Sequence, residues 1–190
     1  MIIRLLSTAT LVFILTSCSL FRPVVQVPID SQAETMIDQG KRLMRSKDYP
    51  EALDAFDSAV GDKFHQSTTY ALYMSGLAAY YAKYDGVAKE RFEKLAIEYP
   101  DSRYLVEAEY HLALIRLRKS REFDKVEGVV KLMEIADQTR DASLSQDAIT
   151  HAQQALFTSF TTEKLKGIEA RLPQSAKIYL KEALIFKLLQ

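Results

Sequence analysis

The chain has 190 residues, and its 25 Lys and Arg side chains balance 25 Asp and Glu side chains, so the formal net charge is zero. That balance gives no support to nucleic-acid binding, which needs a basic excess. A hydrophobic content of 48% is enough for a packed core and argues against an intrinsically disordered chain. Only six glycines and five prolines are present, which favours long helices over many short strands.

Residues 1–17 have the pattern of a secretory signal. Arg4 is followed by the mostly apolar run LLSTATLVFIL, which is shorter than the roughly 20 residues that span a bilayer. The run ends in Leu15-Thr16-Ser17-Cys18. This box resembles the lipobox of bacterial lipoproteins, in which the cysteine is lipidated and becomes the first residue. The alternative is a simple signal anchor with an incidental cysteine.

Cys18 is the only cysteine of the chain. The resemblance implies a thioether to lipid at this residue, which leaves no thiol for a disulfide, a metal or a nucleophile. It also implies sorting to the outer membrane, because Ser19 rather than Asp follows the cysteine. Residues 18–31 contain Pro23 and Pro28 and show no helical period, so we interpret them as an extended tether. A short strand in VVQV is the alternative.

From Ser31 onward the hydrophobic pattern is helical, and a motif recurs with a period of 36 residues. Ser31 and Glu34 have the spacing of a capping box. The internal spacing of the motif resembles the tetratricopeptide repeat, a helix hairpin in which small residues let two helices touch and a phenylalanine fills the seam. The chain departs from that family in having no Trp, in its longer joint, and in carrying Phe64 where a proline would end the first unit. The recurring residues are Gly40, Ala52 and Phe56, then Gly76, Ala88 and Phe92.

Weaker helical patterns continue to the end of the chain. A third, degenerate hairpin is expected, in which Leu112 and Ala113 lie near the position that the repeat glycine takes in the first two units. We therefore predict an all-α fold, an α-solenoid of about three tetratricopeptide-like hairpins over residues 32–140. A degenerate repeat and C-terminal capping helices are expected over 141–190, where the apolar ending IFKLLQ must pack or dock a partner. The helices expected after the second unit cover 102–120, 122–137, 142–160, 162–173 and 175–190.

The segment FEKLAIEYPDSRY carries a more specific resemblance, which extends over about residues 32–137. It is similar to repeat proteins of Gram-negative envelopes, namely BamD-like β-barrel assembly lipoproteins and the repeat domain of the Tol-Pal coordinator. The resemblance implies a non-catalytic adaptor, lipid-anchored on the periplasmic face of the outer membrane, that binds envelope proteins or peptides. A pilotin-like assembly chaperone for a secretin or pilus is the alternative, and an envelope hydrolase is the alternative from another class.

No catalytic or metal-binding pattern marks the sequence. His65, His111 and His151 lie far apart and lack partners at ligand spacing, so each is interpreted as a surface or hydrogen-bonded histidine. The motifs HExxH, GxSxG and the Walker glycine loop are missing from the sequence. We therefore expect no catalytic residue, no metal, no cofactor and no small-molecule substrate.

Tyrosines concentrate in the predicted helix TTYALYMSGLAAYYAKY. In the tetratricopeptide fold the first helix of each hairpin lines a concave groove, and tyrosine is enriched at binding hot spots. The alternative is that the last helices fold into the groove and make these tyrosines part of the core. Counting from Gly40, from Gly76 and from the matching place in the third unit assigns nine residues to partner binding, namely Lys41, Arg45, Tyr70, Tyr73, Leu77, Tyr80, Tyr81, Tyr110 and Arg118.

Overall fold

The computed structural model describes residues 31–61 and 66–189. Within these residues the chain forms α-helices, two short 3-10 turns and their connections, and no strand is present. The all-α prediction is therefore confirmed. The predicted signal, Cys18, the tether as far as residue 30, Phe64 and His65 lie outside the described residues, whereas Ser31, the last residue assigned to the tether, begins α1.

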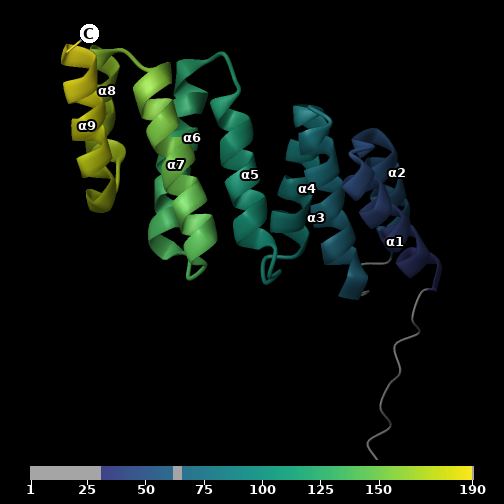
Figure 1. The fold of residues 1–190 in the computed structure, drawn as a ribbon. Helices are drawn as coiled ribbons and strands as arrows, with labels where there is room; N and C mark the ends of the chain where they lie inside the picture. Colours follow the sequence, from purple (N-terminus) through teal and green to yellow (C-terminus); the bar gives the residue numbers. More distant parts are fainter. Residues whose placement is uncertain (1–30, 62–65, 190) are drawn as a thin grey trace, which may run out of the picture.

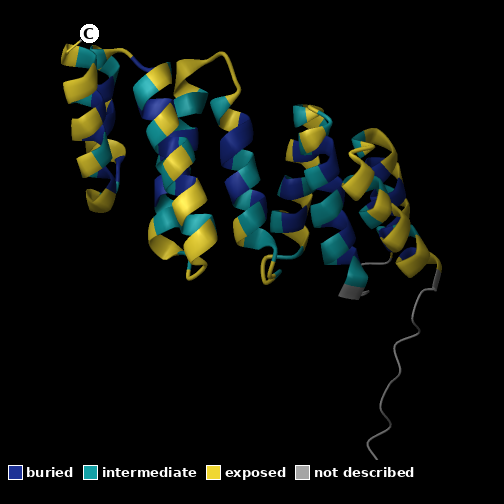
Figure 2. Ribbon diagram, in the orientation of Figure 1, coloured by how far each residue is buried: buried dark blue, intermediate teal, exposed yellow. Residues whose placement is uncertain are grey.

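The described helices pack one after another in the order of the sequence and form an elongated row, with α1 and α2 at one end and α8 and α9 at the other (Figure 1). Burial follows the seams between neighbouring helices (Figure 2). The elements are α1 (Ser31–Ser46), α2 (Tyr49–Ala59), α3 (Gln66–Tyr81), α4 (Asp85–Glu98), α5 (Leu105–Leu117), α6 (Glu122–Gln138), α7 (Ala142–Ser159), α8 (Thr162–Ile168), the 3-10 turns η1 (Glu169–Arg171) and η2 (Gln174–Ala176), and α9 (Lys177–Leu188).

The first two helix pairs, α1–α2 and α3–α4, are held by the same glycine–phenylalanine contact. A Cβ atom added at Gly40 would lie 2.7 Å from the ring of Phe56, and one added at Gly76 would lie 2.6 Å from the ring of Phe92. Both phenylalanines are fully buried. The recurring glycine and phenylalanine therefore make the contact that their spacing predicted, because only glycine lets the ring approach the first helix so closely.

The turn inside each of these pairs is also duplicated. Lys47 and Lys83, 36 residues apart, both have φ = 66°, the left-handed region that non-glycine residues rarely adopt. Asp48 N–H donates to the carbonyl of Leu43 (3.0 Å), and Tyr84 N–H makes the matching bond to Ala79 (2.9 Å). These bonds satisfy carbonyls that the ends of α1 and α3 would otherwise leave open.

In the third pair, α5–α6, the glycine of the close contact lies on the second helix and not on the first. A Cβ atom added at Gly128 would be 2.9 Å from the carbonyl oxygen of Ala113. No residue of the α5–α6 turn has a positive φ. This difference is the physical reason why the sequence signature of the repeat fades after the second unit.

An ion-pair cluster ties the first pair to the second. Asp57 of α2 accepts hydrogen bonds from Nε of Arg91 (3.0 Å), from Nη2 of the same side chain (2.9 Å) and from Oγ of Ser75 (2.5 Å). Burial alone would raise the pKa of Asp57, but the bonds from Arg91 and Ser75 and the charge of Arg91 hold it below its usual range. The carboxylate thus joins α2, α3 and α4.

The buried side chains form two clusters that meet at α5. One runs from Ile37 through Ala108 and Ile115, and the other runs from Tyr110 through α6 and α7 to Ala183 of α9. Polar links also fasten the last helices to α6: Lys164 pairs with Glu122, and Arg171 pairs with Glu127. The C-terminal helices are therefore packed elements of the same row.

Candidate functional site

The tyrosines of α3 lie along the seam with α5. Tyr73 stacks on Tyr104, with ring centroids 5.2 Å apart and planes 6° from parallel. Tyr70 lies 5.7 Å from the same ring and also meets the edge of Phe56. At the other end of the seam, Tyr80 packs edge-on against His111 at 5.1 Å. The rings therefore have one side against α5 and are half-buried.

His111 is the aromatic centre of this seam. Its ring stacks on Phe92 at 5.6 Å and meets Tyr73 and Tyr110 at their edges. Nδ1 lies 2.7 Å from the carbonyl oxygen of Glu107, and in the neutral ring it is the nitrogen that donates. Burial lowers the pKa of His111, although the bond to Glu107 partly opposes that effect. His111 is therefore a neutral packing residue, as the hydrogen-bonded interpretation predicted.

The phenol groups of the seam are held neutral. Burial raises the pKa of Tyr73, and the nearby charge of Glu107 raises it further. Burial also raises the pKa of Tyr80, against the opposing charge of Arg118, and it raises the pKa of Tyr110 to about 12. These hydroxyl groups can donate and accept hydrogen bonds at physiological pH, but they carry no charge.

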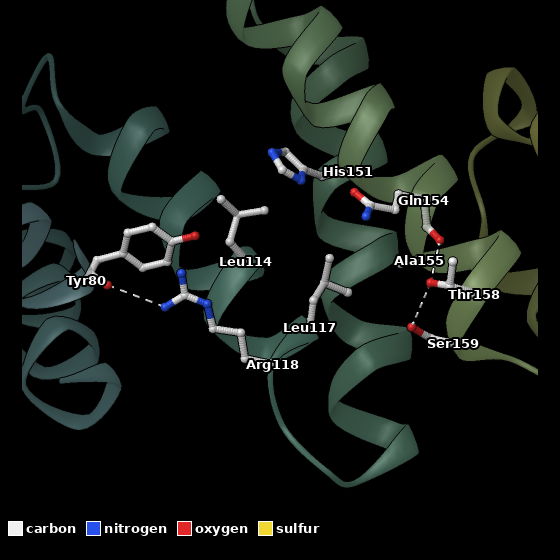
Figure 3. Close-up of a pocket in the computed structure, with 9 residues that line it drawn as sticks. All are labelled: Tyr80, Leu114, Leu117, Arg118, His151, Gln154, Ala155, Thr158 and Ser159. Carbon is white, nitrogen blue, oxygen red and sulfur yellow. Dashed lines mark hydrogen bonds between the residues drawn. The ribbon is translucent and has the colours of Figure 1, made fainter. Parts of the chain in front are cut away.

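A hollow of about 280 Å³ opens where α3, α5 and α7 come together (Figure 3). Its apolar wall comes from two leucines of α5 and an alanine of α7, whereas its polar groups come from all three helices. Such a mixture of apolar surface and a few convergent polar groups is typical of a ligand pocket. The lining residues are Tyr80, Leu114, Leu117, Arg118, His151, Gln154, Ala155, Thr158 and Ser159.

Arg118 is the charged group of this hollow, and two neighbours fix its position. Its guanidinium carbon lies 3.8 Å from the centre of the Tyr80 ring. Nη1 donates to Oδ1 of Asp85 (2.7 Å) and to the carbonyl oxygen of Tyr80 (3.4 Å). The Tyr80 side chain also hydrogen-bonds to Arg118, which opposes the rise in the pKa of Tyr80. The planar guanidinium is therefore held by both neighbours as a positioned cation of the hollow.

Further cations lie near the Tyr80 ring or close to Arg118 along the chain. Lys83 lies 5.9 Å from the centre of the Tyr80 ring, and Arg116 and Lys119 are exposed on either side of Arg118 along the chain. Arg121 is exposed as well and pairs with Asp124. Asp85, which pairs with Arg118, balances part of this positive charge.

The nine residues assigned to partner binding separate into groups. Tyr80 and Arg118 line the hollow, and Tyr70, Tyr73 and the half-buried Leu77 lie along α3. Lys41 pairs with Asp38 and also lies 5.5 Å from the ring centre of Tyr70. Tyr81 is exposed and stacks on Tyr49, and Arg45 is exposed in the last turn of α1. Tyr110 is only 8% exposed, because it packs between α5 and α7.

The last two helices do not cover the tyrosines of α3. Helix α9 packs on α7 and α8, at the far end of the row from α1 (Figure 1). The helix that faces Tyr80 across the hollow is α7, which contributes His151 and Gln154. The alternative expected from the sequence, a groove filled by the last helices, therefore applies neither to α8 nor to α9.

Several residues of the site were not assigned from the sequence. Tyr104, the residue before α5, stacks on Tyr73 and begins a stripe of side chains at spacings of three and four residues that continues along α5. That stripe was visible in the sequence, but which helix it would face was not. The α7 residues of the hollow had no signal at all, because their helix lies beyond the recognisable repeats. The stripe consists of Tyr104, Glu107, His111, Leu114 and Arg118.

In comparisons with known proteins, no protein-family model matches the chain, and no curated protein matches it. Among the described residues, none of the helices is long and apolar enough to cross a membrane. Within the same ranges, no group of three or more His, Cys, Asp and Glu side chains is arranged to hold a metal ion.

Proposed function

We propose that this protein is a non-catalytic adaptor, anchored by lipid at Cys18 to the periplasmic face of the outer membrane, which binds a segment of an envelope protein between its helices. Its fold class would be that of the tetratricopeptide repeats. Support for that class comes from the duplicated glycine–phenylalanine contact and the duplicated left-handed turn, each with a period of 36 residues.

The observation that carries the binding role is the hollow between α3, α5 and α7. It combines the ring of Tyr80, the apolar side chains of Leu114 and Leu117, and a positioned guanidinium at Arg118. Tyrosine and arginine are the residue types that most often dominate binding energy at interfaces. The guanidinium of Arg118 favours a partner segment that brings a carboxylate to it and an apolar side chain to the leucines.

Site-specific photo-crosslinking in the native envelope tests the binding role. A photo-reactive residue at Tyr80 should capture an envelope protein, whereas the same residue at the exposed Ile97 of α4 serves as the control. Arg118→Ala should weaken the capture at Tyr80. If the residue at Tyr80 cross-links only to other parts of the same chain, or if Tyr80 and Ile97 capture partners equally, the hollow is not the binding surface.

The identity of the captured protein separates the adaptor from its alternative. A component of β-barrel assembly or of envelope maintenance supports the adaptor, whereas a secretin or pilus subunit supports a pilotin-like chaperone. The anchor is tested separately, because Cys18→Ser should move the chain from the outer-membrane fraction to the soluble periplasmic fraction. Unchanged fractionation of that variant would contradict lipidation at Cys18.

A further inference from the structure

Helix α9 turns an apolar stripe away from the rest of the protein. Leu180 and Ala183 face inward and are buried, whereas Ile178 is 58% exposed and Ile185 is 59% exposed. At 100° per residue these two isoleucines, seven positions apart, point in almost the same direction. Leu189 is 82% exposed and extends the same stripe.

The flanks of the stripe are large as well. Leu188 is 72% exposed on one side, and Phe186 is 44% exposed on the other while its ring packs on Phe157 of α7. Outer helices of a packed row normally carry polar side chains on the face turned to water. A contiguous exposed apolar patch marks an interaction surface.

We propose that this stripe is a self-association surface, on which a second copy of the chain packs its own α9 side by side and in the same direction. Such a dimer has a two-fold axis parallel to the helices. Ile178 then meets Ile178 of the second copy, and Ile185 meets Ile185 of the second copy. The surface is self-complementary, as a two-fold interface requires.

The charges beside the stripe select a second copy and this direction. Lys181 lies about 60° to one side of Ile178, and Glu182 lies about 40° to the other side, both at nearly the same height on the helix. In the parallel arrangement, Lys181 of each copy faces Glu182 of the other. An antiparallel arrangement about the same point would bring the two Lys181 side chains together, which costs free energy.

The exposed area is sufficient for a weak dimer. Five large apolar side chains with these exposures present on the order of 500 Å² per copy, so the pair would bury about 1,000 Å², near the lower limit for a specific interface. A lipid surface is a less suitable occupant, because Glu182 would have to lie in it without a partner.

The direction of α9 also suits the proposed anchor. In Figure 1, α1 begins at the lower edge of the row and α9 ends at the upper edge. A two-fold axis along α9 therefore places the start of α1 at the same edge in both copies. If the chains are lipid-anchored as proposed above, both could reach one membrane; the self-association itself does not depend on the anchor.

Cysteine cross-linking in the native envelope tests the proposal with the full chain. Ile178→Cys alone and Ile185→Cys alone should each give a disulfide-linked dimer under mild oxidation, because each faces itself across the axis. Co-expressed Ile178→Cys and Ile185→Cys chains should not link to each other, since their Cα atoms would be about 10 Å apart and a disulfide needs less than about 7 Å. Ile97→Cys on α4 and the unsubstituted chain are the controls.

Reversing the charges of Lys181 and Glu182 then tests whether a second copy of the chain, and not another protein, covers the stripe. In the Ile185→Cys background, Lys181→Glu or Glu182→Lys alone should lose the cross-link, and the double exchange should restore it. Self-association is overturned if Ile185→Cys links another protein and not a second copy, or if the three charge variants behave alike. Capture from Tyr80 and fractionation of Cys18→Ser do not involve α9, so these results leave the proposed function untouched.

Discussion

The glycine–phenylalanine contact makes a sharp prediction about Gly76→Ala. The added methyl group would lie 2.6 Å from the Phe92 ring, whereas Gly86→Ala in α4 would place the same methyl group with nothing within 4 Å. Both glycines are helical and neither has a positive φ. Gly76→Ala, in the interior of α3, therefore gains about 0.5–1 kcal/mol from the preference of alanine for helix, and Gly86→Ala, in the first turn of α4, gains no more than that.

The difference between the two variants isolates the cost of overpacking. The ring of Phe92 is fully buried and has no open space to move into, so this cost should be about 1–3 kcal/mol. For a protein of this size that energy corresponds to a difference in Tm of about 2–12 °C. Gly76→Ala should melt below the natural protein and Gly86→Ala at or above it.

Thermal unfolding followed by circular dichroism at 222 nm measures both variants. A third variant, Gly76→Ala with Phe92→Leu, makes room for the methyl group, and its loss should be smaller than the sum of the two single losses. If Gly76→Ala melts at the same temperature as Gly86→Ala, the ring does not depend on a bare glycine backbone. The reasoning that links the 36-residue motif to helix packing would then be refuted.

Three further predictions concern ion pairs, pH and the turns. Asp57→Asn should cost about 1–2 kcal/mol in urea unfolding, because it removes the charge that Arg91 binds. The difference should begin to shrink near pH 3.8, where the unfolded carboxyl takes up a proton, and should be lost as the pH falls through the lowered pKa of Asp57 in the folded chain. The pKa of His111 is lowered in the folded chain, so as the pH falls the unfolded chain takes up a proton near pH 6.5 and the folded chain only at lower pH. The free energy of unfolding should therefore decrease from pH 7.5 to pH 5. That slope should be weaker in His111→Gln, and an equal slope would contradict it. Lys47→Gly should raise the free energy of unfolding by up to about 1 kcal/mol, and Tm with it, because Lys47 has φ = 66°, which glycine adopts without strain. Lys119→Gly, at a position with no positive φ, is the control and should lower Tm.

The helices themselves were readable from the sequence. The predicted helix over 142–160 is α7, and the predicted helix over 162–173 is α8 followed by η1, which ends at Arg171, two residues before Pro173. These boundaries are local properties, because proline, capping residues and hydrophobic periodicity act within a few positions of the chain. The repeat glycines were readable for the same reason: two residues at a fixed spacing meet whenever a hairpin forms.

The assignment of the binding residues was less complete. Counting from Gly76 placed Tyr80 on the surface that forms the hollow, but the corresponding count in the third unit placed Tyr110 there, and Tyr110 is buried against α7. A count within one helix gives the direction of a side chain relative to its own hairpin. It does not give the next helix that covers that side chain.

The sequence by itself determined the helical class, the 36-residue motif, the glycine–phenylalanine contacts and the prediction of a lipid anchor at Cys18, because each depends on residues close together in the chain or on a fixed spacing. Only the tertiary structure decided that α7 faces Tyr80, that Arg118 is positioned by Asp85, and that α9 turns its isoleucines outward. These features arise from contacts between helices more than 30 residues apart, or from the lack of a described neighbour on one face of α9. Periodicity identifies the apolar face of a helix, and the packing of the whole chain decides whether that face is covered.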